Sequence, residues 1–108
     1  MIKNVTKVIE HFGYWPEFCD AKIKSFSNDS GLINMSIHYI DSDQSKSATI
    51  DLRFSDVSQV ELSELKSENV IDLLKISGSE PYEVIVEPCY GIGGSFTCSS
   101  IEVCGINA

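Results

Sequence analysis

The stretch HFGYWPEFCDA, residues 11–21, separates a helical pattern from a series of strand patterns and so decides the fold. An apolar stripe at helical spacing leads into this stretch and consists of Val5, Val8, Ile9 and Phe12. Gly13 follows at once, in the position of a helix-ending glycine, and Pro16 discourages continuation. The sequence therefore predicts an N-terminal helix and a structured connector that leads into a sheet.

The connector holds Tyr14, Trp15 and Phe18, and Trp15 is the only tryptophan of the chain. We expect Trp15 and Phe18 to pack between the helix and the sheet as a structural plug. The alternative is that Tyr14 or Trp15 is partly exposed as an anchor for a partner, because binding hot spots favour these residue types.

After the connector, apolar and polar residues alternate in segments typical of strands. These segments are 33–39, 48–54, 57–62, 82–87 and 96–103, together with 67–76, which also fits a short helix. We favour a strand there that ends at Ser77-Gly78. A phase slip at Ser55 and Asp56 indicates a bulge or corner, and YGIGG, residues 90–94, indicates the reversal of a final hairpin. The chain is expected to form a single α+β domain over residues 1–108, with one N-terminal helix packed on a mainly antiparallel sheet of about six strands.

The charge of the chain limits its partners. Sixteen Asp and Glu against eight Lys and Arg give a formal charge of −8. Nucleic acid and anionic membranes are disfavoured as direct partners, because phosphate contacts need a basic patch. No signal peptide and no apolar run of membrane-spanning length is visible, so we expect a cytoplasmic protein with four reduced cysteines.

No motif indicates catalysis or a metal site. His11 and Cys19 are eight residues apart with no spacing rule linking them, and a buried structural thiol is the favoured interpretation of Cys19. Cys98 and Cys104 do not have zinc-ligand spacing, although the final hairpin would bring Cys89 near Cys98. The GIGG run lacks the Lys-Ser/Thr of a phosphate loop. We therefore expect no catalytic residue, no cofactor and no metal.

Four stretches in order along nearly the whole chain carry a resemblance to a known family. They are FGYWPEFCDA (12–21), LRFSDVSQVEL (52–62), SENVIDLLKI (67–76) and YGIGGSFTCSSIEV (90–103). Together they resemble the Immunity protein 50 family, small immunity proteins of bacterial polymorphic toxin systems. The family often has His where this chain has Cys19, and this departure favours a packing role for the position. The resemblance implies that the chain binds and neutralises a cognate toxin in the producing cell, without catalytic residues.

Eight of the sixteen acids lie between residues 41 and 72, and an acidic face there would suit a basic toxin. The predicted partner-binding residues are Asp41, Asp43, Asp51, Asp56, Glu61, Glu64, Tyr14 and Tyr90. The first four are expected to face solvent on one side of the sheet. The alternative function is a small-molecule-binding or enzymatic domain with a pocket near Trp15, Cys19 and His11. A convergent pocket with titratable groups would favour the alternative, and a flat acidic face would favour the binding protein. No pattern in the sequence identifies the toxin or an oligomeric state.

Overall fold

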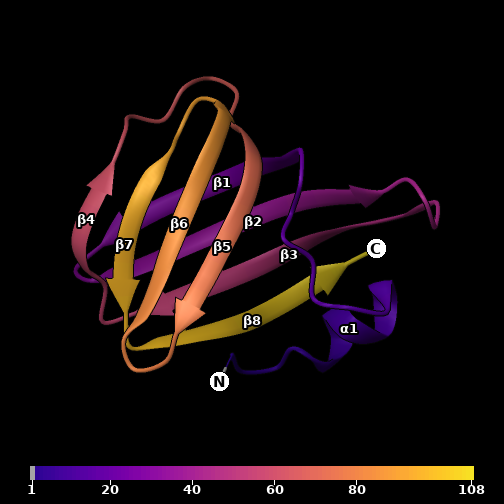
Figure 1. Ribbon diagram of the computed structural model, residues 1–108, viewed down its shortest axis with the longest axis horizontal. Helices are drawn as coiled ribbons and strands as arrows, with labels where there is room; N and C mark the ends of the chain where they lie inside the picture. Colours follow the sequence, from indigo (N-terminus) through magenta and orange to yellow (C-terminus); the bar gives the residue numbers. More distant parts are fainter. Residues whose placement is uncertain (1) are drawn as a thin grey trace.

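The computed structural model describes residues 2–108, which form one short helix and eight strands of an antiparallel sheet (Figure 1). The elements are α1 (Thr6–Phe12), β1 (Ala21–Asp29), β2 (Leu32–Asp41), β3 (Lys46–Ser55), β4 (Ser58–Leu62), β5 (Val70–Gly78), β6 (Tyr82–Tyr90), β7 (Gly94–Cys98) and β8 (Ser100–Asn107). The strands are hydrogen-bonded in the order β4-β7-β6-β5-β1-β2-β3-β8. The predicted α+β class and the antiparallel sheet are confirmed, but the described residues form eight strands rather than about six.

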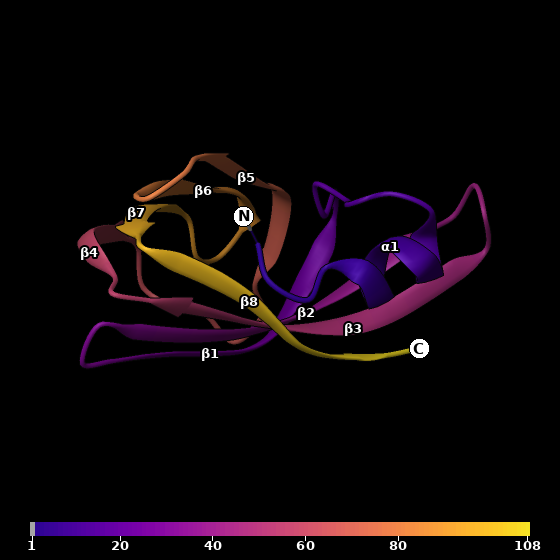
Figure 2. The same ribbon diagram turned by 90° about the horizontal axis from the view of Figure 1, so that it is seen from below.

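The sheet folds over itself into two layers (Figure 2). One layer is β1-β2-β3-β8 and the other is β5-β6-β7-β4. The layers are joined by a short pairing, Ala21 with Ile71 and Lys22 with Val70. The inner faces pack together, and the rings of Phe54 and Phe96 meet edge to face with centroids 5.1 Å apart. The remaining part of the first layer is covered by α1 and the connector (Figures 1 and 2).

The helix forms where the apolar stripe predicts it. Val8 and Phe12 are buried, and Gly13 ends the helix in the left-handed region at φ 88°. The N–H of Gly13 donates to the carbonyl of Ile9, which is the hydrogen bond expected of a left-handed helix cap. No helix of the described residues has the length and hydropathy needed to cross a lipid bilayer.

Strand β1 was absent from the sequence prediction, because its alternation is interrupted. Its register against β2 shifts between Ile23 and Ser25, which marks a bulge. Ile23 and Phe26 therefore both turn toward the core although they are three residues apart, an odd spacing that breaks the two-residue period of a strand.

The prediction of a single strand over 96–103 is wrong. The chain turns a corner at Ser99, so that β7 pairs with β6 in one layer and β8 pairs with β3 in the other. The predicted corner at Ser55 and Asp56 is confirmed, and Asp56 has a positive φ of 54°. The two corners meet, because the N–H of Ser99 donates to the carbonyl of Ser55 at 3.0 Å. The chain crosses between the layers from β3 to β4 and from β7 to β8, and this hydrogen bond holds the two crossings together.

The ambiguous segment 67–76 and the glycine-rich turn after β6 both belong to the second layer. Residues of 67–76 form strand β5 from Val70 onward, which confirms the favoured interpretation. The GIGG run is the turn between β6 and β7, as predicted. A side chain at Gly94 would collide with the backbone of Glu61, so glycine is what allows β4 to lie against β7. The side chain of Asn69 binds the N–H groups of Lys66 and Ile92 and ties this turn to the β4–β5 loop.

Candidate functional site

The connector and α1 meet the β2–β3 hairpin in a cluster that we call the aromatic end: Phe12, Tyr14, Trp15, Phe18 and Tyr39. Tyr39 forms T-shaped ring pairs with Phe12, at 5.2 Å between centroids, and with Phe18, at 5.7 Å. Trp15 stacks edge to face on Phe18 at 5.7 Å. Phe18 is fully buried, whereas Trp15 is half-buried. The expected plug is therefore confirmed for Phe18, and Trp15 both packs against the core and reaches the surface.

Asp41 belongs to the aromatic end and is only 8% exposed. Its Oδ2 accepts hydrogen bonds from the Tyr14 hydroxyl at 2.8 Å and from Gln44 Nε2 at 2.7 Å. Its Oδ1 accepts from the N–H groups of Asp43 and Gln44 at 3.1 and 3.3 Å. These donors, Gln44 first and Tyr14 second, lower the pKa of Asp41. The expectation that Asp41 faces solvent is wrong, because its carboxylate is used to close the β2–β3 turn.

Tyr14 is tied to the same cluster. Its hydroxyl lies 2.8 Å from the hydroxyl of Tyr39, and this hydrogen bond, burial and the neighbouring carboxylate raise the pKa of Tyr14. Gln44 extends the network to the end of α1, since its Nε2 also donates to the carbonyl of Phe12 at 2.7 Å. The Tyr14 side chain remains 39% exposed. The exposed part of Tyr14 can therefore contact a partner while its hydroxyl keeps the hydrogen bonds to Tyr39 and Asp41.

The other three acids of the first group lie apart from one another. Asp43 is exposed in the β2–β3 turn. Asp51 is half-buried on the outer face of β3, where the hydroxyl of Ser36 donates to it. Asp56 sits at the corner after β3 and accepts a bond of 2.6 Å from the Ser99 hydroxyl. The predicted single face containing Asp41, Asp43, Asp51 and Asp56 does not form.

Glu61, Glu64 and Tyr90 belong instead to the second layer. Glu61 is exposed on β4, Glu64 is exposed in the β4–β5 loop, and Tyr90 is 57% exposed at the end of β6. The strand register aligns Glu61 with Ser95 of β7, and Ser95 in turn with Ile85 of β6. Directly paired residues share one face of a sheet. Glu61 therefore lies on the outer face of this layer.

Two further acids share that outer face and were not among the predicted residues. Glu83 and Glu87 flank Ile85 at two-residue spacing on β6, and both are exposed. They alternate with Tyr82, Val84 and Val86, which are buried. Among the outward residues of this layer, we call the following six the acidic face: Glu61, Leu73, Lys75, Ile85, Glu83 and Glu87. The alternation within 82–87 was the available signal for Glu83 and Glu87, because it fixes which side of the strand faces water.

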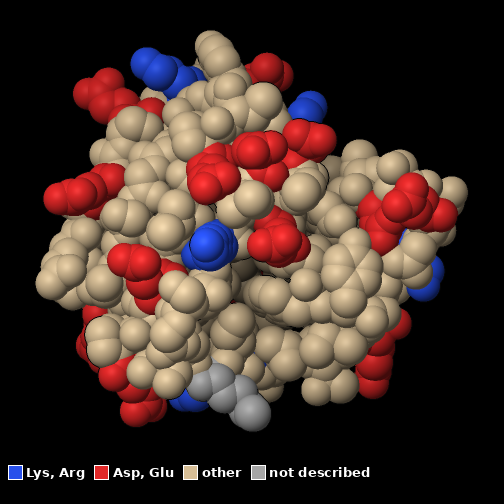
Figure 3. Space-filling model, viewed as in Figure 1, with Lys and Arg blue, Asp and Glu red and all other residues tan. Residues whose placement is uncertain are grey.

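Figure 3 looks onto this layer and shows many carboxylates with few Lys and Arg among them. The segment 57–98, which contains all four strands of the layer, has seven of the sixteen acids and two of the eight Lys and Arg. The layer therefore carries more than half of the net charge of the chain. The acids are concentrated by the pairing of strands in space rather than by the segment 41–72 alone.

The three residues of the alternative pocket line three different hollows. Trp15 lines one between the connector and β5, Cys19 lines one beside Asp41, and His11 lines one near the end of β8. The expectation that Cys19 is buried is wrong, because the residue is exposed. A thiol–imidazole pair needs hydrogen-bond contact. The placement of these three residues therefore gives the enzymatic alternative no converging site.

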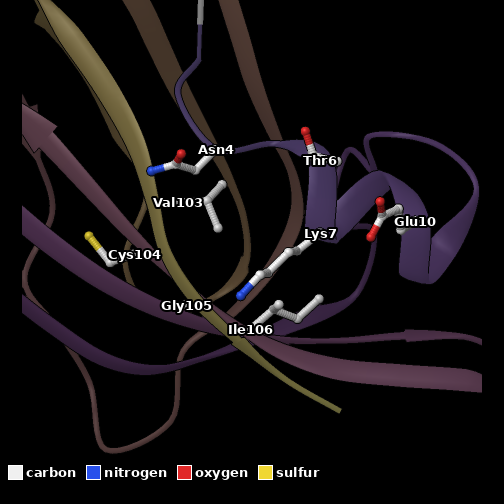
Figure 4. A pocket seen from close by; sticks show the side chains of 8 residues that line it. All are labelled: Asn4, Thr6, Lys7, Glu10, Val103, Cys104, Gly105 and Ile106. Atoms are coloured by element: carbon white, nitrogen blue, oxygen red, sulfur yellow. The ribbon is translucent and has the colours of Figure 1, made fainter.

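A further hollow of about 440 Å³ lies between α1 and β8 (Figure 4). Lys7 extends from the helix toward β8, whereas the sulfur of Cys104 points away from the helix (Figure 4). The thiol and the amine therefore do not face each other, and this hollow brings together no nucleophile and base.

The cysteines are dispersed over the fold. Cys98 is buried, and burial raises the pKa of its thiol to about 11. Its register partner is Tyr82, at the opposite end of β6 from Cys89, so the expected approach of Cys89 to Cys98 does not occur. Within residues 2–108, no three His, Cys, Asp or Glu side chains are grouped so that they could hold a metal ion.

Comparison with known proteins identifies one family. The model of the family described as Immunity protein 50 matches residues 4–108, nearly the whole chain. No curated protein matches the chain. No solved structure matches it either.

Proposed function

The chain belongs to the Immunity protein 50 family, and on this premise we propose that it binds a cognate bacterial toxin domain and neutralises it by protein–protein association. The observation that carries the proposal is the family match over residues 4–108. The toxin would belong to a polymorphic system, contact-dependent or secreted. The chain would act in the cytoplasm of the producing cell, as a binding protein rather than an enzyme.

The arrangement of side chains supports association over chemistry. His11, Trp15 and Cys19 line separate hollows, and Lys7 and Cys104 face in different directions. A catalytic site would need a nucleophile, a base and an orienting group within hydrogen-bond reach of one another. A protein that works by binding needs only a complementary surface.

The charge supports a basic toxin. A net charge of −8 favours a cationic partner, because complementary potentials accelerate encounter. Toxins that act on nucleic acid carry positive charge, since they have to neutralise phosphates. A bound carboxylate surface would then occupy the place of those phosphates and block the toxin.

Co-expression tests the proposal. We expect the reading frame beside that of this chain to encode a large secreted protein, and the C-terminal domain of that protein is the probe. Host cells that produce the domain alone should die, and cells that also produce this chain should survive. The control is a Phe18→Ala variant, which lacks a fully buried ring. This variant should protect the host cells less, because neutralisation of the toxin needs the folded chain. Death of cells that contain the folded wild-type chain would contradict the proposal.

A further inference from the structure

We propose that the acidic face, together with the hollow beside Trp15, is the surface on which a cationic protein partner docks. This inference rests on the proposed function and names the surface and the partner's chemistry. The partner would place Lys and Arg side chains against Glu61, Glu83 and Glu87, and one apolar side chain in the hollow.

The strand register makes the acidic face continuous. One row across the sheet runs Lys75, Ile85, Ser95 and Glu61, and the next runs Ser77, Glu83, Thr97 and Ser58. Glu87 pairs with Leu73 on the other side of Ile85. Ile85 and Leu73 are half-buried and the three glutamates are exposed. The face thus has an apolar middle, Ile85 and Leu73, with three glutamates and one lysine, Lys75, around it. Stable interfaces have a similar division between core and rim.

The opposite outer face, on β1-β2-β3-β8, has a different charge pattern. Arg53 of β3 pairs directly with Glu102 of β8, so opposite charges are neighbours there. Lys22 and Lys24 of β1 add positive charge to the same layer, and Asp51 of β3 adds negative charge, so acids and bases offset each other there. Because of this compensation, the field of the molecule should be most negative over the second layer, and a cation should approach from that side.

The hollow beside Trp15 is an observation independent of charge. It has a volume of about 330 Å³ and is lined mainly by apolar groups, among them Trp15, Leu74, Ile76 and Tyr82. Lys75 belongs both to its lining and to the acidic face, so the two are contiguous.

Tyr82 adds an unpaired polar group to that lining. Its side chain is 5% exposed, and its hydroxyl is the buried side-chain atom without a hydrogen-bond partner among residues 2–108. A buried hydroxyl is usually paired, and leaving it unpaired is unfavourable. The layer therefore keeps a buried polar group unsatisfied at a hollow that adjoins its acidic face. A partner group that settles there, with the accompanying shift of side chains, would remove this cost.

Charge reversal tests the acidic part of the surface. The test variant combines Glu61→Lys, Glu83→Lys and Glu87→Lys. The matched control combines Glu10→Lys, Asp29→Lys and Asp43→Lys, which are exposed positions outside this layer with the same total charge change. Binding to the toxin domain described above is measured at two ionic strengths. The face variant should associate at least about tenfold more slowly than the control at low salt and should lose most of its salt dependence.

A bulky side chain tests the hollow. Glu17 is exposed, lines the hollow and uses its carbonyl, not its side chain, to accept the N–H of Leu74 at 2.7 Å. Glu17→Trp should fill the space and raise the dissociation rate about tenfold. Glu10→Trp, at an exposed position on α1, is the control and should bind like wild type.

The outcomes separate this inference from the proposed function. If wild type does not bind the toxin domain, the proposed function fails and the docking surface fails with it. If wild type binds and the face variant binds as the control does, the docking surface is wrong and the proposed function stands. Circular dichroism and thermal unfolding of every variant show that a loss of binding does not come from a loss of folding.

Discussion

The aromatic end and the acidic face both contain carboxylates from the segment 41–72, but the two regions use them differently. At the aromatic end, Asp41 is nearly buried and accepts bonds from Tyr14, Gln44 and two backbone N–H groups. On the acidic face, Glu61 is exposed in a row of outward side chains. Acids that are close in sequence therefore do not form one surface, because strand pairing distributes them over the fold.

The difference predicts that the two regions respond to different measurements. A carboxylate that accepts several internal donors contributes to the free energy of unfolding, and its removal leaves those donors unpaired. An exposed carboxylate contributes little to stability and acts mainly on the rate of association. Substitutions at the aromatic end should change folding, and substitutions on the acidic face should change binding.

The largest effect is expected from Phe18→Ala. Phe18 is fully buried between Trp15 and Tyr39, and truncation of such a ring costs about 3–5 kcal/mol. Urea unfolding followed by circular dichroism measures the change. The triple variant of the acidic face should instead stay within about 0.5 kcal/mol of wild type per substitution. Equal losses in both proteins would remove the distinction between the two regions.

A smaller loss is expected from Trp15→Ala. Trp15 is half-buried, so the change should cost about 1–2 kcal/mol, less than full burial of a ring provides. In the wild-type protein, Trp15 fluorescence should be partly quenched by iodide, and the toxin domain should reduce that quenching. An unchanged melting temperature combined with lost binding would place Trp15 in the interface alone.

Asp41→Asn should destabilise the protein in a pH-dependent way. The donors around Asp41 lower its pKa below the ordinary value of 3.8. The contribution of the carboxylate to stability is therefore complete above about pH 4 and is lost as the pH falls through the lower folded-state value. Wild type should exceed the variant in stability at pH 7, and the gap should narrow toward pH 2. The control Asp43→Asn, at an exposed turn position, should show no comparable gap at pH 7. A constant gap across the range would show that the charge of Asp41 is not what stabilises the turn.

The last prediction concerns the reactivity of the thiols and involves no change in stability or binding. Cys19, Cys89 and Cys104 are exposed, whereas Cys98 is buried with a pKa raised to about 11. Iodoacetamide at pH 8 should modify three cysteines of the native protein quickly, as counted by mass spectrometry. Unfolding without reductant should raise the count to four, because all four cysteines have free thiols in the structure. A final count of two or none would show that disulfides form.

Parts of this fold follow from short-range pattern. The helix was predicted because its apolar stripe and Gly13 lie within eight residues. Strands β2 and β3 were predicted because their alternation is unbroken. Strand β1 was missed because its bulge changes the spacing of buried residues. Strands β7 and β8 were predicted as one strand because apolar and polar residues alternate on both sides of the corner at Ser99. Odd spacings of buried residues mark both places, but only the pairing shows which are bulges and which are corners.

The candidate site followed less fully from the sequence, and the reason is again distance along the chain. The partner that buries Asp41 is Tyr14, 27 residues away, and no local pattern links them. The sequence alone could have identified Glu83 and Glu87 as outward residues, because the buried residues between them define the outward side of β6. Glu61 joins them only because the strands pair in the order β4-β7-β6. This order places β4, which follows β3 in sequence, at the far edge of the other layer.

The most direct test of the account is an NMR titration of the isotope-labelled chain with the toxin domain, since a protein of 11.9 kDa gives resolved amide signals. The account predicts that the largest shifts fall on β4, on 82–87 of β6 and on residues 15–17 beside the hollow. The β2–β3 turn, including Asp41 and Gln44, should shift little. Largest shifts at Tyr14 and residues 41–44, with β6 unchanged, would contradict the account and place the interface at the aromatic end.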